Sequence, residues 1–145
     1  MTNRFRWKNM AAVVACFAVC AGCDADYERL YEVENQTDEV VRIELRYTKA
    51  DRVLSGKDRV FTIEAGTKAM LFDRGGHCQS KYVPEDLYPE PDMVLEPFDK
   101  FDVYAGDILL DEDLRRRKHW EYSAKKLVGV YTLRITEELV ADLIE

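Results

Sequence analysis

Apolar residues recur at every second position along much of the chain, and this spacing limits the folds open to it. In residues 41–47, valine, isoleucine, leucine and tyrosine alternate with arginine and glutamate. Successive side chains of a β-strand point to opposite faces of its sheet, so this segment is predicted to be a strand with one buried face. Residues 30–34, 60–64, 101–104 and 127–135 show similar spacing, with turn residues between the segments. The sequence therefore predicts an all-β protein.

Short strands separated by frequent turns favour two packed sheets over other all-β arrangements. We predict a single-domain β-sandwich of immunoglobulin-like or transthyretin-like type over residues 29–145. The polar residues 35–38 suit a hairpin turn, and Gly75 and Gly76 are expected to interrupt the chain. Thr136 before two glutamates predicts the N-cap of a short C-terminal helix, with a final strand as the alternative.

The first 23 residues differ in composition from the rest of the chain. Three basic residues precede an apolar run of 12 residues at 10–21, and no acidic residue occurs before Asp24. A basic start, a short apolar run and small residues at its end are typical of a secretory signal peptide. As a helix, 12 residues extend about 18 Å, whereas the hydrocarbon core of a membrane is about 30 Å thick. We therefore predict that residues 1–22 are a cleaved signal peptide.

The end of this segment carries a more specific pattern. Ala21, Gly22 and Cys23 resemble the lipobox of bacterial lipoproteins, in which small residues precede a cysteine that is lipidated and becomes the new N-terminus. Cys20 stands at the position where that pattern usually has an aliphatic residue, and it is a second possible acceptor. An ordinary signal peptide with an incidental cysteine, or a short buried helix, is the alternative. The resemblance implies that a lipid on Cys23 holds the chain at a membrane.

The whole arrangement resembles small Bacteroidetes-type lipoproteins of unknown function. Besides the lipobox, the resemblance is carried by residues 33–37 and 131–136 and by an acidic segment, 24–28, after the lipidated cysteine. That segment is interpreted as a tether, either a plain solvated linker or a surface-export signal. The resemblance implies a location in the bacterial cell envelope, with the outer membrane favoured and the exposed side undetermined, and it implies no activity.

Charge and cysteine content exclude several classes of function. The chain has 21 Lys and Arg against 28 Asp and Glu, and removal of residues 1–22 changes the formal net charge from −7 to −10. Binding to nucleic acid depends on clustered basic residues, so no nucleic-acid partner is expected, whereas basic protein partners are favoured. Without residues 1–22 only Cys23 and Cys78 remain. If Cys23 is lipidated, Cys78 has no disulfide partner.

The residue types needed for catalysis or metal binding are scarce. His77 and His119 are the only histidines, and Cys78 follows His77 directly. A nucleophilic cysteine needs a base beside it, and zinc needs three or four ligands. Adjacent residues of a strand also point to opposite faces. We expect no cofactor, no metal and no enzymatic activity, with a small hydrolase that uses Cys78 as the remaining alternative.

Residues 84–97 contain all four prolines and several acidic residues, so they are predicted to form an irregular loop between strands. Long loops of this kind frequently carry function, although a structural crossover between sheets would explain the segment as well. Its acids do not follow a calcium-binding pattern. The candidate recognition residues in and beside the loop are Tyr82, Glu85, Asp86, Tyr88, Glu90 and Asp92.

Two further groups of residues have competing interpretations. Trp120 and Tyr122 are a candidate aromatic platform for sugars, but their strand spacing favours the core. The basic run 115–118 could meet phosphate groups, but the acidic residues 111–113 cancel most of its charge.

From these features we expect a lipid-anchored envelope protein whose β-domain binds an envelope or extracellular protein or a glycan. An inhibitor or immunity-type protein that blocks a cationic hydrolase is the alternative, since the acidic loop could serve as its wedge.

Overall fold

The chain folds into two sheets of four strands each, which confirms the predicted all-β sandwich. The computed structural model describes residues 24–49, 54, 56–79 and 82–144. The first sheet has the order β4 (Lys68–Gln79), β1 (Asp24–Asn35), β8 (Val128–Ile135), β7 (Trp120–Lys125). The second has the order β3 (Asp58–Ile63), β2 (Val41–Tyr47), β5 (Phe98–Ala105), β6 (Ile108–Leu109). A short 3-10 helix, η2 (Arg117–His119), precedes β7, and α2 (Glu137–Ile144) follows β8. The predicted signal peptide and Cys23 lie outside the described residues.

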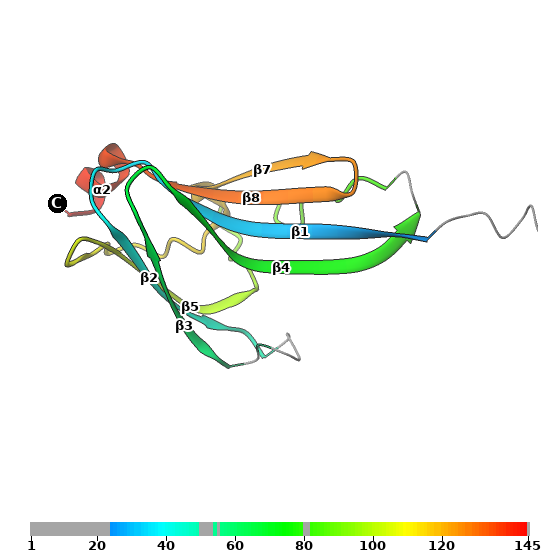
Figure 1. The fold of residues 1–145 in the computed structure, drawn as a ribbon, viewed down its shortest axis with the longest axis horizontal. Helices are drawn as coiled ribbons and strands as arrows, with labels where there is room; N and C mark the ends of the chain where they lie inside the picture. The colour runs from blue at the N-terminus through cyan, green and yellow to red at the C-terminus, as the bar shows by residue number, and fades with distance from the viewer. Residues whose placement is uncertain (1–23, 50–53, 55, 80–81, 145) are drawn as a thin grey trace, which may run out of the picture.

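The strands of the second sheet run obliquely to those of the first (Figure 1). The two sheets lie close together near α2 and diverge toward the end where β1 begins and β4 ends. β1 and β8 are parallel, and every other strand pair is antiparallel. In the immunoglobulin order the first two strands are neighbours in one sheet, whereas β1 and β2 lie in different sheets.

The predicted hairpin at residues 35–38 is wrong, because this turn carries the chain from one sheet to the other. Asn35 is fully buried, and its amide donates hydrogen bonds to the carbonyl oxygens of Glu39 and Ile63. Its side-chain oxygen accepts from the backbone N–H and the hydroxyl of Thr37. These bonds fix a corner whose second arm belongs to the other sheet, which turn composition alone does not distinguish from a hairpin.

The expected break at Gly75 and Gly76 is also wrong, since both residues lie inside β4 and pair with β1. A Cβ atom on Gly76 would lie 2.6 Å from Cε1 of Tyr27, so the absence of a side chain makes room for that ring. Because β4 continues through the glycines, β1 is paired from Asp24 onward, with Gln79 opposite. Residues 24–28, predicted as a tether before a domain at 29–145, therefore form the first part of this strand.

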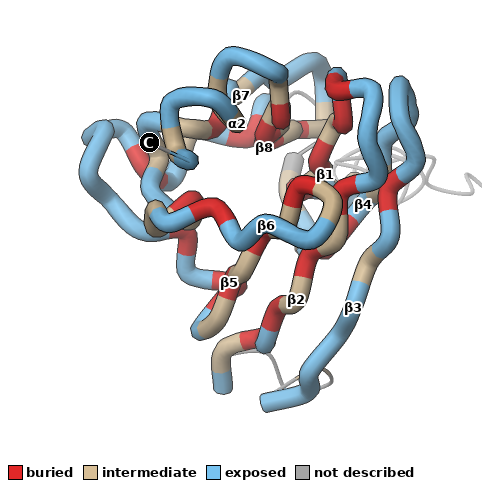
Figure 2. Tube along the Cα trace, turned by 90° about the vertical axis from the view of Figure 1, so that its left-hand side faces the viewer, coloured by how far each residue is buried: buried red, intermediate tan, exposed pale blue. Residues whose placement is uncertain are grey.

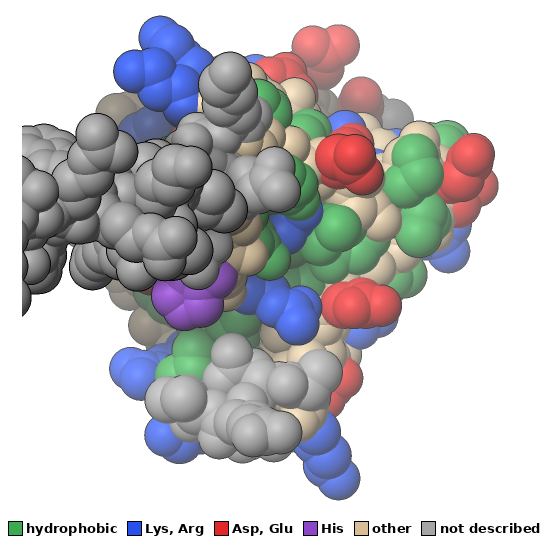
Figure 3. All heavy atoms as spheres, turned by 90° about the vertical axis from the view of Figure 1, so that its right-hand side faces the viewer, with side chains coloured by type: hydrophobic (Ala, Val, Ile, Leu, Met, Phe, Trp, Pro, Cys, Tyr) green, Lys and Arg blue, Asp and Glu red, His purple; other side chains and the backbone are tan. Residues whose placement is uncertain are grey.

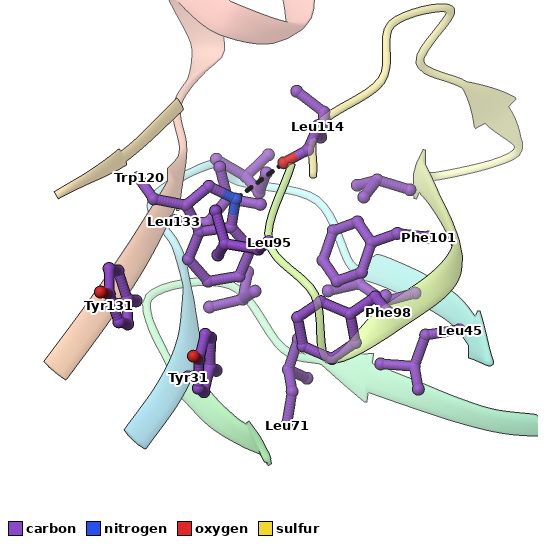
Figure 4. Close-up of a cluster of buried hydrophobic side chains, with 14 of the residues drawn as sticks. Tyr31, Leu45, Leu71, Leu95, Phe98, Phe101, Leu114, Trp120, Tyr131 and Leu133 are labelled. Atoms are coloured by element: carbon purple, nitrogen blue, oxygen red, sulfur yellow. Dashed lines mark hydrogen bonds between the residues drawn. The ribbon is translucent and has the colours of Figure 1, made fainter. Parts of the chain in front are cut away.

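The predicted alternation is confirmed in β2 and β8, where buried positions alternate with partly buried or exposed ones, and Figure 2 shows it along β2 and β5. The core is rich in aromatic rings: Tyr31 stacks on Tyr131 at 4.9 Å between ring centroids, and Phe98 stacks on Trp120 at 6.3 Å. The Trp120 indole N–H donates to the carbonyl oxygen of Leu114 at 2.7 Å (Figure 4). This bond satisfies a polar atom that would otherwise be buried unpaired.

The C-terminal helix is confirmed. The backbone N–H of Leu139 donates to the Thr136 hydroxyl at 3.1 Å, which is the predicted N-cap. Leu139, Val140 and Leu143 pack against the core from one side of the helix.

Candidate functional site

Residues 82–97 connect β4 to β5 and are the candidate site on which the sequence analysis centred. The segment passes behind the first sheet in Figure 1, and only the isolated bridge between Val94 and Arg116 gives it regular pairing. The segment is nevertheless held by hydrogen bonds to the first sheet on one side and by ion pairs and backbone hydrogen bonds to residues 112–118 on the other.

Asp86 is the centre of the first set of contacts. One carboxylate oxygen accepts hydrogen bonds from the Tyr131 hydroxyl and the Tyr88 backbone N–H, each at 2.9 Å. The other oxygen accepts from Nη2 and Nε of Arg117 at 2.8 and 3.2 Å. Burial acts to raise the pKa of Asp86, but these donors outweigh it and the pKa is lowered. Asp86 is therefore ionised, and it holds the loop to Tyr131 and Arg117 instead of serving as an exposed recognition residue.

Tyrosine hydroxyls make further contacts between the sheet and the loop. The Tyr131 hydroxyl accepts from the Leu87 backbone N–H at 2.7 Å, and the Tyr122 hydroxyl donates to the Pro84 carbonyl. Tyr88 is only 4% exposed, and its hydroxyl accepts from the Glu96 backbone N–H at 3.2 Å. Burial raises the pKa of Tyr88 and Tyr131, which keeps both hydroxyls protonated. Tyr88 therefore belongs to the core.

The basic run 115–118 fastens the other side of the loop. Every one of its four side chains has a carboxylate within ion-pair distance: Arg115 with Asp113, Arg116 with Asp92, Arg117 with Asp86, and Lys118 with Glu112. Backbone bonds from Leu95 to the Arg115 carbonyl and from Arg117 to the Met93 carbonyl join the same two segments. The run is therefore neutralised, half of it by the adjacent acids and half by the loop.

The outward side of the loop carries aliphatic and acidic side chains together. We use the name loop face for its exposed aliphatic and acidic residues: Val83, Glu85, Leu87, Glu90, Asp92, Met93, Val94 and Glu96. Its four aliphatic residues, Val83, Leu87, Met93 and Val94, are between 39% and 49% exposed, although Pro84, Tyr88, Leu95 and Pro97 of the same loop are buried. An open groove of about 420 Å³ adjoins Val94 and is lined by Thr48, Val94, Leu95, Glu96, Phe98, Asp99 and Arg115.

Sequence reasoning selected the acids of the loop face but missed its aliphatic residues. Of the six candidate residues, Glu85, Glu90 and Asp92 are exposed, whereas Asp86 and Tyr88 are held inside and Tyr82 is half-buried. The sequence signal that could have identified them is the presence of aliphatic residues between prolines. The prolines prevent a regular strand, so these aliphatic side chains have no sheet to pack against unless the loop folds back on the domain.

The aromatic platform predicted as an alternative for Trp120 and Tyr122 is wrong. Trp120 is 2% exposed and lies among Phe98, Phe101 and Tyr31 in the core, as Figure 4 shows. Tyr122 is half-buried, with its ring against Tyr131. Strand spacing had favoured the core for both, and burial of their large apolar area is the reason.

The structure does not bring the histidines and Cys78 together as a catalytic group. Cys78 lies 3.4 Å from the Ala25 carbonyl oxygen, and Nδ1 of His77 lies 2.5 Å from a carboxylate oxygen of Asp26. His119 lies near Glu112, and burial lowers its pKa although the carboxylate opposes this. Within the described ranges, no group of three or more His, Cys, Asp or Glu side chains is arranged to hold a metal ion.

A second hollow, of about 350 Å³, lies between α2 and the β7–β8 pair. Its lining residues are Lys118, His119, Trp120, Glu121, Thr132, Arg134, Thr136, Glu138, Leu139 and Asp142. Arg134 forms ion pairs with Glu34 and Glu121, so the hollow is polar and its main cation is paired.

Among the described residues, no helix has the length and apolar character needed to cross a membrane. Comparison with protein-family models, with curated proteins and with solved structures finds no match to this chain.

Proposed function

We propose that this chain is a lipid-anchored cell-envelope protein whose β-sandwich binds a protein partner through the loop face, without catalysis. The observation that carries the proposal is a long loop held in one conformation by buried contacts while Val83, Leu87, Met93 and Val94 stay exposed beside acids. Exposed apolar groups on a rigid support are the usual features of a recognition surface.

A protein partner is favoured over a glycan by the kind of side chain that is exposed. Sugar recognition typically uses exposed aromatic rings, but Tyr88 and Trp120 are buried and Tyr122 is half-buried. The loop face instead offers aliphatic groups with three acids that have no ion pair among the described residues, Glu85, Glu90 and Glu96. A partner with apolar anchors and with lysine or arginine around them would match both features.

The groove beside Val94 gives such a partner a place for one side chain. Its lining includes the buried Leu95 and Phe98, the exposed Glu96 and Asp99, and Arg115, whose guanidinium is paired with Asp113. Because Asp113 balances the charge of Arg115, the apolar and acidic parts of the lining suit the long stem and charged end of a lysine or arginine.

The binding surface can be tested with substitutions that introduce a positive charge on the loop face, compared with the same kind of substitution elsewhere. Leu87→Lys and Val94→Lys should each weaken capture of the envelope partner at least tenfold, because each places a cation where a basic partner docks. Val60→Lys is the control, since Val60 is 63% exposed on β3 in the other sheet. Equal capture by all three variants and the wild type would refute the loop face as the docking surface.

The anchor requires its own experiment because it rests on the lipobox resemblance alone. Cys23→Ser should release the protein from the membrane fraction of its host, whereas Cys20→Ser should leave it there. Protease treatment of intact cells then separates a surface location from a periplasmic one. Recovery of the Cys23→Ser variant in the membrane fraction would reject the anchor.

An inhibitor or immunity-type protein that acts on a cationic hydrolase is the second candidate, and the unpaired acids of the loop face favour it. The two candidates differ in readout. Inhibition of a cationic envelope hydrolase that is lost in Glu90→Lys would favour this second function, while partner binding without inhibition would favour the first. Turnover that disappears in Cys78→Ser would overturn both.

A further inference from the structure

Arg29 is a buried cation for which the described residues supply no carboxylate partner. It is 5% exposed on the inner face of β1, and its Nη2 donates to the Tyr82 hydroxyl at 3.2 Å and weakly to the Glu85 carbonyl at 3.5 Å. The guanidinium carbon lies 5.0 Å from the centre of the Tyr27 ring. Its Nε is buried and has no hydrogen-bond acceptor within the described part of the chain. Burial of a guanidinium is costly unless an anion or full hydrogen bonding compensates.

The residue directly opposite Arg29 on β4 is Arg74, a second arginine. Directly opposite residues of an antiparallel pair share one face with Cβ atoms about 5 Å apart, and like charges in this arrangement are destabilising. On the other side of Arg29 the neighbour is Gly129 of β8, which adds no side chain to the row. Arg74 is exposed, so one arginine of the pair is open to solvent and the other lies beneath the loop.

This lack of acidic partners is unusual in a chain with a net charge of −7. Six of the nine described arginines have a carboxylate within ion-pair distance. The three without one are Arg29, Arg59 and Arg74, and Arg59 is an exposed residue of the other sheet. Two unpaired arginines side by side, one of them buried, indicate a place where an anion from outside the chain completes the charge balance.

We propose that Arg29 and Arg74 form a binding site for a phosphate group. The Nε and Nη2 donors of a guanidinium can bind two oxygens of one anion. In Arg29 the Tyr82 hydroxyl occupies the Nη2 donor and Nε is unused, so a ligand that displaces this hydroxyl engages both. A tetrahedral phosphate that binds Arg29 through two of its oxygens has further oxygens directed away from that guanidinium toward Arg74, whereas both oxygens of a carboxylate face the same guanidinium in a bidentate contact.

The site lies near the middle of the paired strands β1 and β4, and its source of phosphate is a phospholipid headgroup or a soluble phosphate ester. Figure 3 looks at the end of the first sheet where β1 begins and β4 ends, and it shows basic side chains at the surface beside hydrophobic ones. The proposal does not rest on the loop face or on the lipid anchor, because it concerns a different class of ligand and different side chains, although the Glu85 carbonyl is in contact with Arg29.

The test is a titration of the full chain with inorganic phosphate at constant ionic strength. The NMR signal of the Arg29 Nε–H is recorded at each phosphate concentration. We expect this signal to shift in a saturable manner and the thermal unfolding temperature to rise with phosphate. Arg74→Gln should weaken phosphate binding at least tenfold, since it removes a charge-assisted contact. Arg59→Gln is the matched control, an exposed unpaired arginine on β3, and should leave binding unchanged.

Vesicles separate the two sources of phosphate. Binding to vesicles that contain phosphatidylglycerol, weakened by Arg74→Gln and not by Arg59→Gln, would assign a headgroup, and a response to inorganic phosphate alone would assign a soluble ester. An Arg29 Nε–H signal that does not move in either titration would overturn the proposal. Equal weakening by both substitutions would also overturn it, because it would indicate attraction to net charge only.

Discussion

Replacement of Asp86 by asparagine is the most direct test of how the loop is held. The carboxylate accepts four hydrogen bonds, two of them from Arg117, and the two side chains of this ion pair are only 25% and 20% exposed. Asparagine removes the charge and points an NH₂ group at the donors of Arg117. Breaking a fully buried pair costs about 3–5 kcal/mol, and partial exposure reduces this, so we expect a loss of about 2–3 kcal/mol.

Urea unfolding measures this loss as a lower midpoint with an unchanged slope. Asp92→Asn is the control, because its ion pair with Arg116 joins side chains that are 79% and 46% exposed, and we expect a change below about 0.5 kcal/mol. The pKa of Asp86 is lowered in the folded state, so its contribution is complete at neutral pH and disappears as the pH falls below about 4. A midpoint for Asp86→Asn equal to that of Asp92→Asn would refute the fastening role.

Three other perturbations test the core. His119 has a lowered pKa because it is buried, so the unfolded chain binds a proton first and stability should fall as the pH drops below about 6.5; urea midpoints at pH 7.5 and 5.5 should differ less in His119→Gln. Trp120→Phe should cost about 2–4 kcal/mol, because it leaves the Leu114 carbonyl without its donor and opens a cavity; a thermal unfolding temperature unchanged from wild type would contradict this. Gly129→Ala places a Cβ 2.5 Å from the Tyr122 hydroxyl and should cost about 1–3 kcal/mol in urea unfolding, whereas a neutral result would mean that the ring moves freely.

Period-two alternation was sufficient to predict the strands but not their pairing. Residues 41–47 and 128–135 have one buried face as predicted, because alternation follows directly from strand geometry. Which strands become neighbours depends on contacts that have no local signature. The buried amide of Asn35 turns the chain into the other sheet, and the Tyr27 ring requires Gly76 inside a strand. Both residue types are common in ordinary turns, so local rules predicted turns at both places.

The sequence was sufficient to locate the candidate loop, but not to tell which of its residues are structural and which are exposed for binding. Prolines and acids indicated the loop, yet the distinction between Asp86 and Glu85 depends on Arg117, 31 residues away. The same long-range pairing converts the basic run 115–118 from a candidate phosphate-binding patch into the second fastening of the loop. The sequence did not indicate Arg29 and Arg74 as a site, because the two residues become neighbours only when β1 pairs with β4.

The structural and functional interpretations of the loop therefore concern different atoms of one segment. A loop that becomes ordered only on binding loses conformational entropy at that moment, which weakens the complex. Here Asp86, Tyr88 and Leu95 order the segment during folding, so the loop face is already arranged before it meets the partner that we propose. It follows that Asp86→Asn should weaken capture of a partner although Asp86 touches none, whereas an exposed acid such as Glu90 should alter capture without altering stability. In the proposed function, Asp86, the one interior acid of the loop, acts on affinity through order, and the exterior acids act through contact.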